Sequence, residues 1–330
     1  MNDFRLNNLE LVDLEKSFLN NSKHISHEIK KNYFEYKKEY YDKSIFKNLT
    51  FKIEKGDNII ICPLTLEKRG DKNFLNFFGE PIRIFSKKIL DSDINSYLID
   101  YFNNLKKKHD LQNLFFKIKD NNENNSLTNK NSCKMGGDIF INLGLELDEI
   151  KKCFDPKLRN ELKKNNKEVD FILINANNYE KDEILKMRDL HVSVAGRETR
   201  TKKSWIANEK MILDGNGFLI KVIFKKKIIS YSLFYFNKET CIYFSSCTLR
   251  EYFKEVKNIG DKAIWNAIQF VKNKSNNFYI GSIYEYLKQN TAKNEKELNI
   301  DKFKLKFNKK YEKFCLYDEI PKKFSSYLSV

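Results

Sequence analysis

Three arginines lie close together in this sequence, at Arg188, Arg197 and Arg200. Arginine is scarce here, because most of the 61 lysine and arginine residues are lysine. An arginine offers a planar fork of N–H donors that binds a phosphate or a carboxylate through two hydrogen bonds, which a lysine cannot do. The cluster therefore predicts either a binding site for an anion or a set of ion pairs on a helix surface.

One histidine and two hydroxyl residues are candidates for proton transfer. His191 lies inside the arginine cluster, and histidine is well suited to act as a general base near neutral pH. Tyr243 and Ser245 lie two residues apart in an apolar segment, so the alternation of a strand predicts that they face the same side. Each has a plainer interpretation, because a histidine is more often packed or exposed, and hydroxyl groups often mark the solvent face of a half-buried strand.

A third group of residues, Lys257, Gly260 and Asp261, stands where a predicted helix over Asp261–Val271 begins. The free N–H groups and partial positive charge of a helix N-terminus favour a bound phosphate. A glycine there lets a ligand approach the backbone closely. The segment is a candidate for binding the pyrophosphate of a coenzyme, although one glycine before a helix is more often an ordinary turn.

Several reaction classes lose support because their motifs are missing from the sequence. There is no Ser–His–Asp spacing, HExxH motif, Walker loop or GxGxxG fingerprint, which argues against a hydrolase, a zinc protease and a nucleotide-triphosphate-binding protein. The six cysteines include no CxxC pair, so we expect reduced thiols and no structural metal site.

The composition describes a basic protein with enough apolar residues to fold. The chain has 330 residues, of which 41% are hydrophobic, and a net charge of +16, so it has room for one large or two modest domains. The charge favours an anionic ligand such as a coenzyme, a nucleotide-sugar or a tRNA, although abundant lysine and asparagine also fit a general compositional bias. We expect a cytoplasmic protein without a membrane span, because no run of about 20 apolar residues and no apolar signal segment occurs. The oligomeric state stays open.

The predicted elements follow the same order, hairpin, helix and strand, in both halves of the chain, which predicts two similar α/β units. The first half is predicted to contain a helical segment over residues 7–45, a hairpin over Leu49–Glu54 and Asn58–Leu66, a helix over Asp91–Lys107, a strand over Leu114–Ile118 and a loop over Asp120–Asn131. Three helices are predicted to follow, over Asp155–Asn165, Lys181–His191 and Thr201–Leu213. The second half is predicted to contain strands over Gly217–Phe224, Ile228–Tyr235 and Cys241–Cys247, the helix Asp261–Val271, and strands over Asn277–Ile280 and Phe314–Tyr317.

Several segments, in this order and spacing, together resemble the FemAB-like branch of the GNAT acyltransferase superfamily. The resemblance covers residues 150–318, while the first 150 residues are similar mainly in the order of their elements. The matching segments are Phe154–Leu162 with its Lys/Arg–Arg–Asn–Glu pattern, His191–Trp205 with its basic Arg/Thr/Arg core, the hairpin and third strand Gly217–Ser245, the cofactor-side helix Asn258–Val271, the strand Tyr279–Gly281, and the Phe-Lys-x-x-Phe pattern of Phe303–Phe307.

The resemblance implies an α/β fold with mixed sheets and two tandem GNAT-like subdomains. Residues 1–150 would form a divergent N-terminal subdomain, and residues 151–330 the acyltransferase subdomain. It also implies direct transfer of an acyl group from acyl-CoA, such as acetyl-CoA, to an amine, with no covalent enzyme intermediate and no metal. The amine would belong to an anionic small molecule, such as an amino-sugar nucleotide or a glycan precursor of the cell envelope.

The same resemblance implies roles for individual residues. His191 would be the base, Tyr243 would protonate the leaving thiolate, and Ser245 joins them as a catalytic candidate. The residues that would bind the acyl-CoA cosubstrate are Lys257, Gly260 and Asp261. The residues that would bind the acceptor are Lys157, Arg159, Arg197, Thr199, Arg200 and Trp205.

Two alternatives to this function stay open. The first is a Fem-type transferase that uses aminoacyl-tRNA as its donor, which the positive net charge favours. The second is a non-catalytic nucleic-acid-binding or scaffold protein with a degenerate acyltransferase fold. It is favoured by the reduction of the glycine-rich phosphate loop to Gly260 and by the lack of an acidic residue just before Gly281.

Overall fold

The computed structural model describes residues 5–8, 31–40, 45–86, 88–119, 133–164, 166–284, 295–321, 323–324 and 327–328. The helices are α2 (Lys31–Tyr40), α3 (Ser92–Lys108), α4 (Leu147–Cys153), α5 (Pro156–Leu162), α6 (Glu183–Ala195), α7 (Lys202–Leu213), α8 (Ile259–Val271) and α9 (Glu295–Leu305), with a 3-10 turn at Arg250–Phe253. Nine strands belong to two small sheets: β1 (Arg5–Asn8), β2 (Ile45–Asn48), β3 (Phe51–Lys55), β4 (Asn58–Cys62), β5 (Thr65–Arg69), β6 (Lys72–Asn76), β7 (Phe85–Ser86), β8 (Leu111–Leu114) and β17 (Tyr327–Leu328). Eight strands belong to a large sheet: β9 (Phe116–Lys119), β10 (Cys133–Asn142), β11 (Val169–Ile174), β12 (Gly217–Phe224), β13 (Lys227–Phe236), β14 (Thr240–Thr248), β15 (Asn277–Tyr284) and β16 (Glu312–Tyr317).

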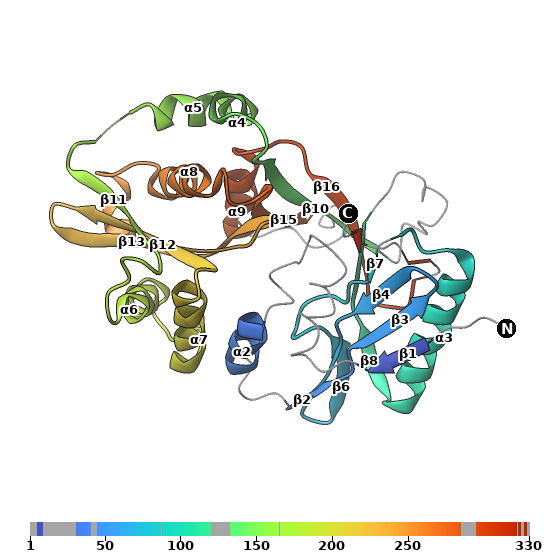
Figure 1. Cartoon of the computed structure of the whole chain (residues 1–330). Coiled ribbons are helices and arrows are strands. Elements are labelled where there is room, and N and C mark those ends of the chain that lie inside the picture. Colours follow the sequence, from blue (N-terminus) through green and yellow to red (C-terminus); the bar gives the residue numbers. More distant parts are fainter. Residues whose placement is uncertain are drawn as a thin grey trace.

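The sheets gather into two lobes (Figure 1). The first lobe holds a five-stranded sheet in the order β1-β3-β4-β7-β17 and a four-stranded sheet in the order β2-β5-β6-β8, with α3 beside them. The second lobe is built on the large sheet, in the order β11-β12-β13-β14-β15-β10-β16-β9. These mixed sheets with flanking helices form the α/β fold that the sequence predicts.

Helices cover both faces of the large sheet (Figure 1). On one face, α4, α5 and α8 bury a core in which Phe154 and Leu158 meet Ile264 and Ile268. On the other face, α6 and α7 bury a second core around Trp205. Burial of such apolar side chains is the main driving force for folding, and it fixes which side of the sheet each helix occupies.

Local sequence signals begin three of these helices as predicted. Asp91 accepts a hydrogen bond from the Ile94 amide at the start of α3, and Asp155 caps α5 ahead of Pro156. The Thr201 side chain caps α7. Such caps satisfy N–H groups that the first helical turn would otherwise leave without partners.

The large sheet extends into the core of the first lobe. Phe116 and Ile118 of β9 are buried with the residues of α3, while β9 itself pairs with β16 in the large sheet. Lys117, between them, points to the other side and forms a buried ion pair with Asp138 of β10 at 2.6 Å. The strand β9 therefore ties the two lobes together. The division of the chain at residue 150 stays a prediction.

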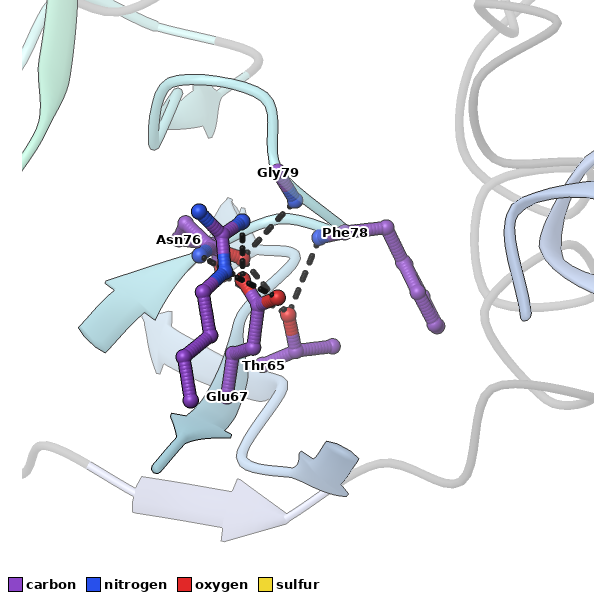
Figure 2. A network of polar contacts seen from close by, with 6 residues as sticks. Thr65, Glu67, Asn76, Phe78 and Gly79 are labelled. Atoms are coloured by element: carbon purple, nitrogen blue, oxygen red, sulfur yellow. Dashed lines mark hydrogen bonds and ion pairs between the residues drawn. The ribbon is translucent and has the colours of Figure 1, made fainter. Parts of the chain in front are cut away.

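A buried polar network shapes the turn that follows β6 (Figure 2). The Asn76 side chain accepts a hydrogen bond from the Gly79 amide and donates one to Glu67, which is fully buried. Thr65 accepts a hydrogen bond from the amide of Phe78, whose φ of +49° is uncommon for a residue other than glycine. The network thus holds a backbone conformation that the local sequence does not favour.

Several predicted elements differ from the structure. Within the described residues, the predicted helix over 7–45 is confined to Lys31–Tyr40, since residues 7–8 and 45 belong to strands. The predicted strand Asn58–Leu66 divides into β4 and β5, with Pro63, which lacks an N–H for a strand ladder, between them. The predicted loop Asp120–Asn131 lies outside the described residues.

The sequence interpretation missed strand β10, where two glycines interrupt the apolar pattern. A Cβ atom on Gly136 would stand 2.5 Å from the Phe314 ring, and one on Gly137 would overlap the Tyr311 ring. These glycines are present because rings from neighbouring chain segments pack directly on the backbone of β10.

Candidate active site

The strand β14 carries the predicted catalytic residues at the point where it leaves its neighbour β15. The two strands pair in parallel only from Thr240 to Ile242 on the β14 side, and then separate. On its other side β14 pairs with β13, where Tyr243 lies opposite Phe234 and Ser245 lies opposite the adjacent Leu233. One residue of β14, Phe244, therefore forms a bulge, which re-aims the side chains that follow it.

Because of the bulge, neighbouring residues of β14 point to different faces of the sheet. The Tyr243 hydroxyl lies 2.5 Å from the Ser246 hydroxyl, on the side of α8. Ser245 instead accepts a hydrogen bond from Arg200, and Phe244 packs beside the core under α6 and α7. The prediction that Tyr243 and Ser245 share a face is wrong, because regular alternation stops at the bulge.

A cavity of about 680 Å³ opens on the α8 side of β14. Residues predicted from the sequence gather in its lining: Lys157, Tyr243, Lys257, Gly260 and Asp261. The sequence interpretation assigned no site role to other residues of the lining, among them Glu161, Phe303 and Lys306. The last two fall in the Phe303–Phe307 motif, which was the available signal for them.

The N-terminus of α8 opens into this cavity without a capping side chain. Asn258, the N-cap residue, has a left-handed φ of +60°, and its side chain donates to Glu161 instead of capping the helix. A Cβ on Gly260 would make ordinary contact with the Phe303 ring at 3.6 Å. The N–H groups of the first turn can therefore bind an anion.

Asp261 is the third residue of α8 and is only 3% exposed. Its Oδ2 lies 3.2 Å from the Lys306 Nζ, whereas its Oδ1 is buried and makes no hydrogen bond within the described chain. Burial raises the pKa of Asp261, while the nearby Lys306 acts in the opposite direction. Asp261 thus has one buried carboxylate oxygen for which the described residues supply no donor.

Tyr243 contributes an aromatic ring to the lining of the cavity. Its ring lies between those of Phe234 and Phe303, with centroids 5.6 and 6.3 Å away. Burial raises the pKa of Tyr243, so its hydroxyl keeps its proton at neutral pH and can donate it.

Arg200 occupies the opposite face of β14 and is surrounded by aromatic rings and hydroxyl groups. Its guanidinium donates to Ser245 at 3.0 Å and to the Tyr36 hydroxyl at 3.3 Å. It also lies 4.5 Å from the centroid of Trp205 and 6.0 Å from that of Tyr40. Within the described residues, no carboxylate pairs with this cation.

His191 belongs to the Arg200 side of the sheet. Its ring packs edge-on against Trp205 at 5.5 Å, and its Nδ1 lies 3.5 Å from the Thr199 hydroxyl. Burial and the charge of Arg200 lower the pKa of His191, so the imidazole is neutral at pH 7 and able to accept a proton.

The remaining residues of the arginine cluster, and Arg159, lie in different surroundings. Arg188 pairs with Asp189 and Glu198, which is the ion-pair alternative of the sequence analysis. Arg197 and the side chain of Thr199 are exposed. Arg159 lies on α5, outside the lining of the cavity.

The helix α2 supplies Tyr36 and Tyr40, which the sequence interpretation did not connect with Arg200. The helix packs along α7, and the Thr201 hydroxyl donates to the Glu39 carbonyl oxygen at 2.9 Å. Because more than 150 residues separate α2 from Arg200 in the chain, no local pattern could reveal the contact.

No group of three or more His, Cys, Asp or Glu side chains in the described ranges is arranged to hold a metal ion. None of the described helices combines the length and the apolar character needed to cross a membrane.

Solved structures supply the comparison that decides the fold. The chain is similar to FemX, with a TM-score of 0.62, 9% identity and 96% of each chain covered. It is also similar to a tandem GNAT protein from the clavulanic acid biosynthesis pathway, with a TM-score of 0.52, 9% identity, and coverage of 96% of this chain and 98% of that one. The chain therefore shares the fold of FemX and of this tandem GNAT protein.

A further similar structure is L-PGS from Bacillus licheniformis, with a TM-score of 0.53, 12% identity, and coverage of 94% of this chain and 92% of that one. No protein-family model matches the chain, and no curated protein matches it by sequence. The fold expected from the sequence motifs is therefore confirmed by structural similarity, which at such low identity says nothing about substrates.

Proposed function

We propose that this chain is an N-acyltransferase that moves an acyl group from acyl-CoA to an amine on an anionic small molecule. The observation that supports this most is the arrangement around β14. A cavity with an uncapped helix N-terminus lies on one face of the strand, and a cation without a carboxylate partner among the described residues lies on the other. A transferase needs two such sites close together, so that donor and acceptor meet in the productive geometry.

The cavity beside α8 is the proposed donor site. The uncapped first turn of α8 suits the pyrophosphate of CoA, and Lys157 and Lys257 line the same cavity. The uncharged arm of the donor would then run toward Tyr243, where β14 and β15 separate.

The Arg200 face is the proposed acceptor site. An arginine whose guanidinium meets only hydroxyl groups and rings can bind a phosphate or carboxylate through two hydrogen bonds. Trp205 packs against the guanidinium, and Thr199 contacts His191 on the same side of the sheet. An amino-sugar nucleotide or a glycan precursor would supply both the anion and the amine. The more distant Arg159 and Arg197 remain candidate contacts for a larger acceptor.

The proposed chemistry is direct attack of the amine on the thioester carbonyl. A backbone N–H of the separated part of β14 would stabilise the oxyanion, and the protonated Tyr243 hydroxyl would supply a proton to the leaving thiolate. A base must take a proton from the attacking amine. His191, on the acceptor face, is the candidate for this base.

Aminoacyl-tRNA is the second candidate donor. The net charge of +16 supports this donor, because lysine and arginine side chains bind the phosphates of a nucleic acid. The fold shared with FemX supports it as well, through the Fem-type transferases that the sequence motifs resemble. A cytoplasmic location and the third alternative, a non-catalytic binding protein, stay predictions.

A donor-by-acceptor assay tests the function. The purified protein is mixed with acetyl-CoA and either glucosamine phosphate or UDP-glucosamine, and thiol release and N-acetyl product are measured. A parallel reaction uses charged tRNA. We expect thiol release that needs the amine and that falls in Arg200→Lys, which keeps the charge but loses the planar fork. Transfer from charged tRNA but not from acetyl-CoA would exclude acyl-CoA as the donor. If neither donor supported transfer, the proposal that the protein is an acyltransferase would be excluded.

A further inference from the structure

The hydroxyl of Tyr243 has one hydrogen-bond partner within the described chain, the hydroxyl of Ser246 at 2.5 Å. The ring of Tyr243 is partly buried and packs near the rings of Phe234 and Phe303. Ser246, in contrast, is exposed, and its hydroxyl makes no second hydrogen bond among the described residues. The pair therefore connects a phenol in the lining of the cavity with the solvent.

The bulge at Phe244 creates this contact. In a regular strand, two residues that are three positions apart point to opposite faces. Tyr243 pairs opposite Phe234 and Ser246 opposite Ser232, so two residues of β14 lie between them where β13 has only one. The extra residue brings Ser246 to the side of Tyr243. Bulges are common next to active sites, where they re-aim a side chain, and here the re-aimed side chain is a hydroxyl.

The proposed reaction gives Ser246 a task. The leaving thiolate takes the proton of Tyr243 in each turnover, so the phenol must regain a proton before the next one. The donor fills the cavity at that moment, and Ser246 is not among the described residues that line the cavity. A serine hydroxyl has one hydrogen to donate and two lone pairs that accept, so Ser246 can take a proton from water while it gives its own to Tyr243.

We infer that Ser246 is the proton relay of the transfer, passing a proton from water to Tyr243 as Tyr243 protonates the leaving thiolate. This inference rests on the proposed function and adds a residue to its acid side. Ser246 acts through Tyr243 and does not touch the substrate. It is also a positioning residue, because a phenol oxygen that accepts from Ser246 directs its own hydrogen elsewhere.

The step balances as follows. The amine attacks the carbonyl carbon, the C–N bond forms, and the C–S bond breaks with its electron pair going to sulfur. The nitrogen loses one proton to the base, for which His191 is the candidate, and the base releases it to water. The thiolate takes the proton of Tyr243, Tyr243 takes that of Ser246, and Ser246 takes one from water. The hydroxide left in the water is neutralised by the proton from the base, so the products are an amide and a thiol.

The hydrogen bond from Ser246 also makes Tyr243 a stronger acid. Burial raises the pKa of Tyr243, and the bond to Ser246 acts in the opposite direction. The reason is that a hydrogen donated by Ser246 stabilises the negative charge that develops on the phenol oxygen as its proton leaves. Loss of the serine hydroxyl should therefore slow the protonation of the thiolate and leave the binding of the donor unchanged.

A double-mutant cycle with acetyl-CoA and UDP-glucosamine tests the relay. Tyr243→Phe should lower kcat about 100-fold or more, and Ser246→Ala about 10-fold with KM for acetyl-CoA unchanged, because water can partly replace the serine. In the Tyr243→Phe background, Ser246→Ala should cause no further loss, because the phenol that it serves is gone. Ser246→Thr keeps the hydroxyl and should keep the wild-type kcat. Ser96→Ala, at an exposed serine of α3, is the matched control and should also keep it.

Rates measured in H₂O and D₂O give a second readout that a purely structural serine would not move. The solvent isotope effect on kcat should be larger in the wild type and in Ser246→Thr than in Ser246→Ala, since the relay adds a moving proton. An equal isotope effect in all three, a Ser246→Ala variant with the wild-type kcat, or an additive loss in the double variant would overturn the inference. A fully active Tyr243→Phe would overturn it as well. A wild-type protein that transfers from no donor would instead overturn the proposed function.

Discussion

The ion pair between Glu67 and Arg69 should respond very differently to the loss of each partner. Arg69 donates to Glu67 through Nε at 2.5 Å and through a terminal nitrogen at 2.8 Å. The two side chains are unequally buried, since that of Glu67 is 0% exposed and that of Arg69 is 50% exposed. Removing Arg69 leaves a carboxylate without solvent, whereas removing the carboxylate leaves a guanidinium that water can reach.

The magnitudes follow from that difference. Breaking a buried ion pair by removing one partner costs about 3–5 kcal/mol, and we expect Arg69→Met to lie at the lower end, about 3 kcal/mol, because Arg69 is half exposed. Glu67→Gln keeps one acceptor oxygen for Asn76 and should cost only about 1–2 kcal/mol.

Urea unfolding followed by circular dichroism measures both variants. Arg250→Met, at an exposed arginine of the 3-10 turn, is the matched control and should stay within about 0.5 kcal/mol of the wild type. If Glu67→Gln destabilised the protein as much as Arg69→Met, unequal burial would not govern this pair and the reasoning would be refuted.

Three further predictions concern stability. Burial alone would raise the pKa of Asp138, but Lys117 and Arg83 hold this pKa below its usual value. The lowered pKa adds to the free energy of unfolding above about pH 4, and this contribution is lost as the pH falls through the pKa of the folded state. Asp138→Asn should cost about 3–5 kcal/mol at neutral pH and reduce the loss of stability in acid, as urea midpoints at neutral and acidic pH would reveal. Gly137→Ala should cost about 1–3 kcal/mol in the same assay, because its Cβ would overlap the Tyr311 ring, and an unchanged midpoint would contradict that packing. Asp261→Asn should raise the free energy of unfolding at neutral pH by about 1 kcal/mol. The gain should vanish below about pH 4, where the aspartate is protonated in both the folded and the unfolded state. A lower free energy of unfolding at neutral pH would mean that the carboxylate has a partner in the fold.

The parts of the fold that local chemistry determines could be predicted from the sequence. Asp91 and Thr201 cap helices because their side chains accept hydrogen bonds from the next turn, a signal contained within a few residues. Gly56, with a φ of +55°, makes the turn between β3 and β4 for an equally local reason. The cavity residues Lys257, Gly260 and Asp261 were found because they lie near a predicted helix start, although α8 begins at Ile259, before the predicted start at Asp261.

Features that depend on distant contacts could not be predicted. The bulge at Phe244 is set by pairing with β13, and nothing in the β14 sequence shows that Ser245 turns away from Tyr243. Strand β10 could not be predicted because its two glycines are explained only by the rings of Phe314 and Tyr311, which lie far along the chain. In each case the sequence does not show which segment of the chain lies beside the strand.

The proposed acceptor face is connected to the first lobe through α2. Arg200 donates to Tyr36 of α2, and the next residue of α2, Lys37, forms a 2.6 Å ion pair with Glu80. Glu80 ends the turn that the network of Glu67 and Asn76 holds in place (Figure 2). A weakened network should therefore loosen the Tyr36 contact before it affects the cavity on the far side of β14. Variants of Glu67 and Arg69 that remain folded should then lose acceptor binding while they keep donor binding, so the first lobe would contribute to specificity as well as to stability.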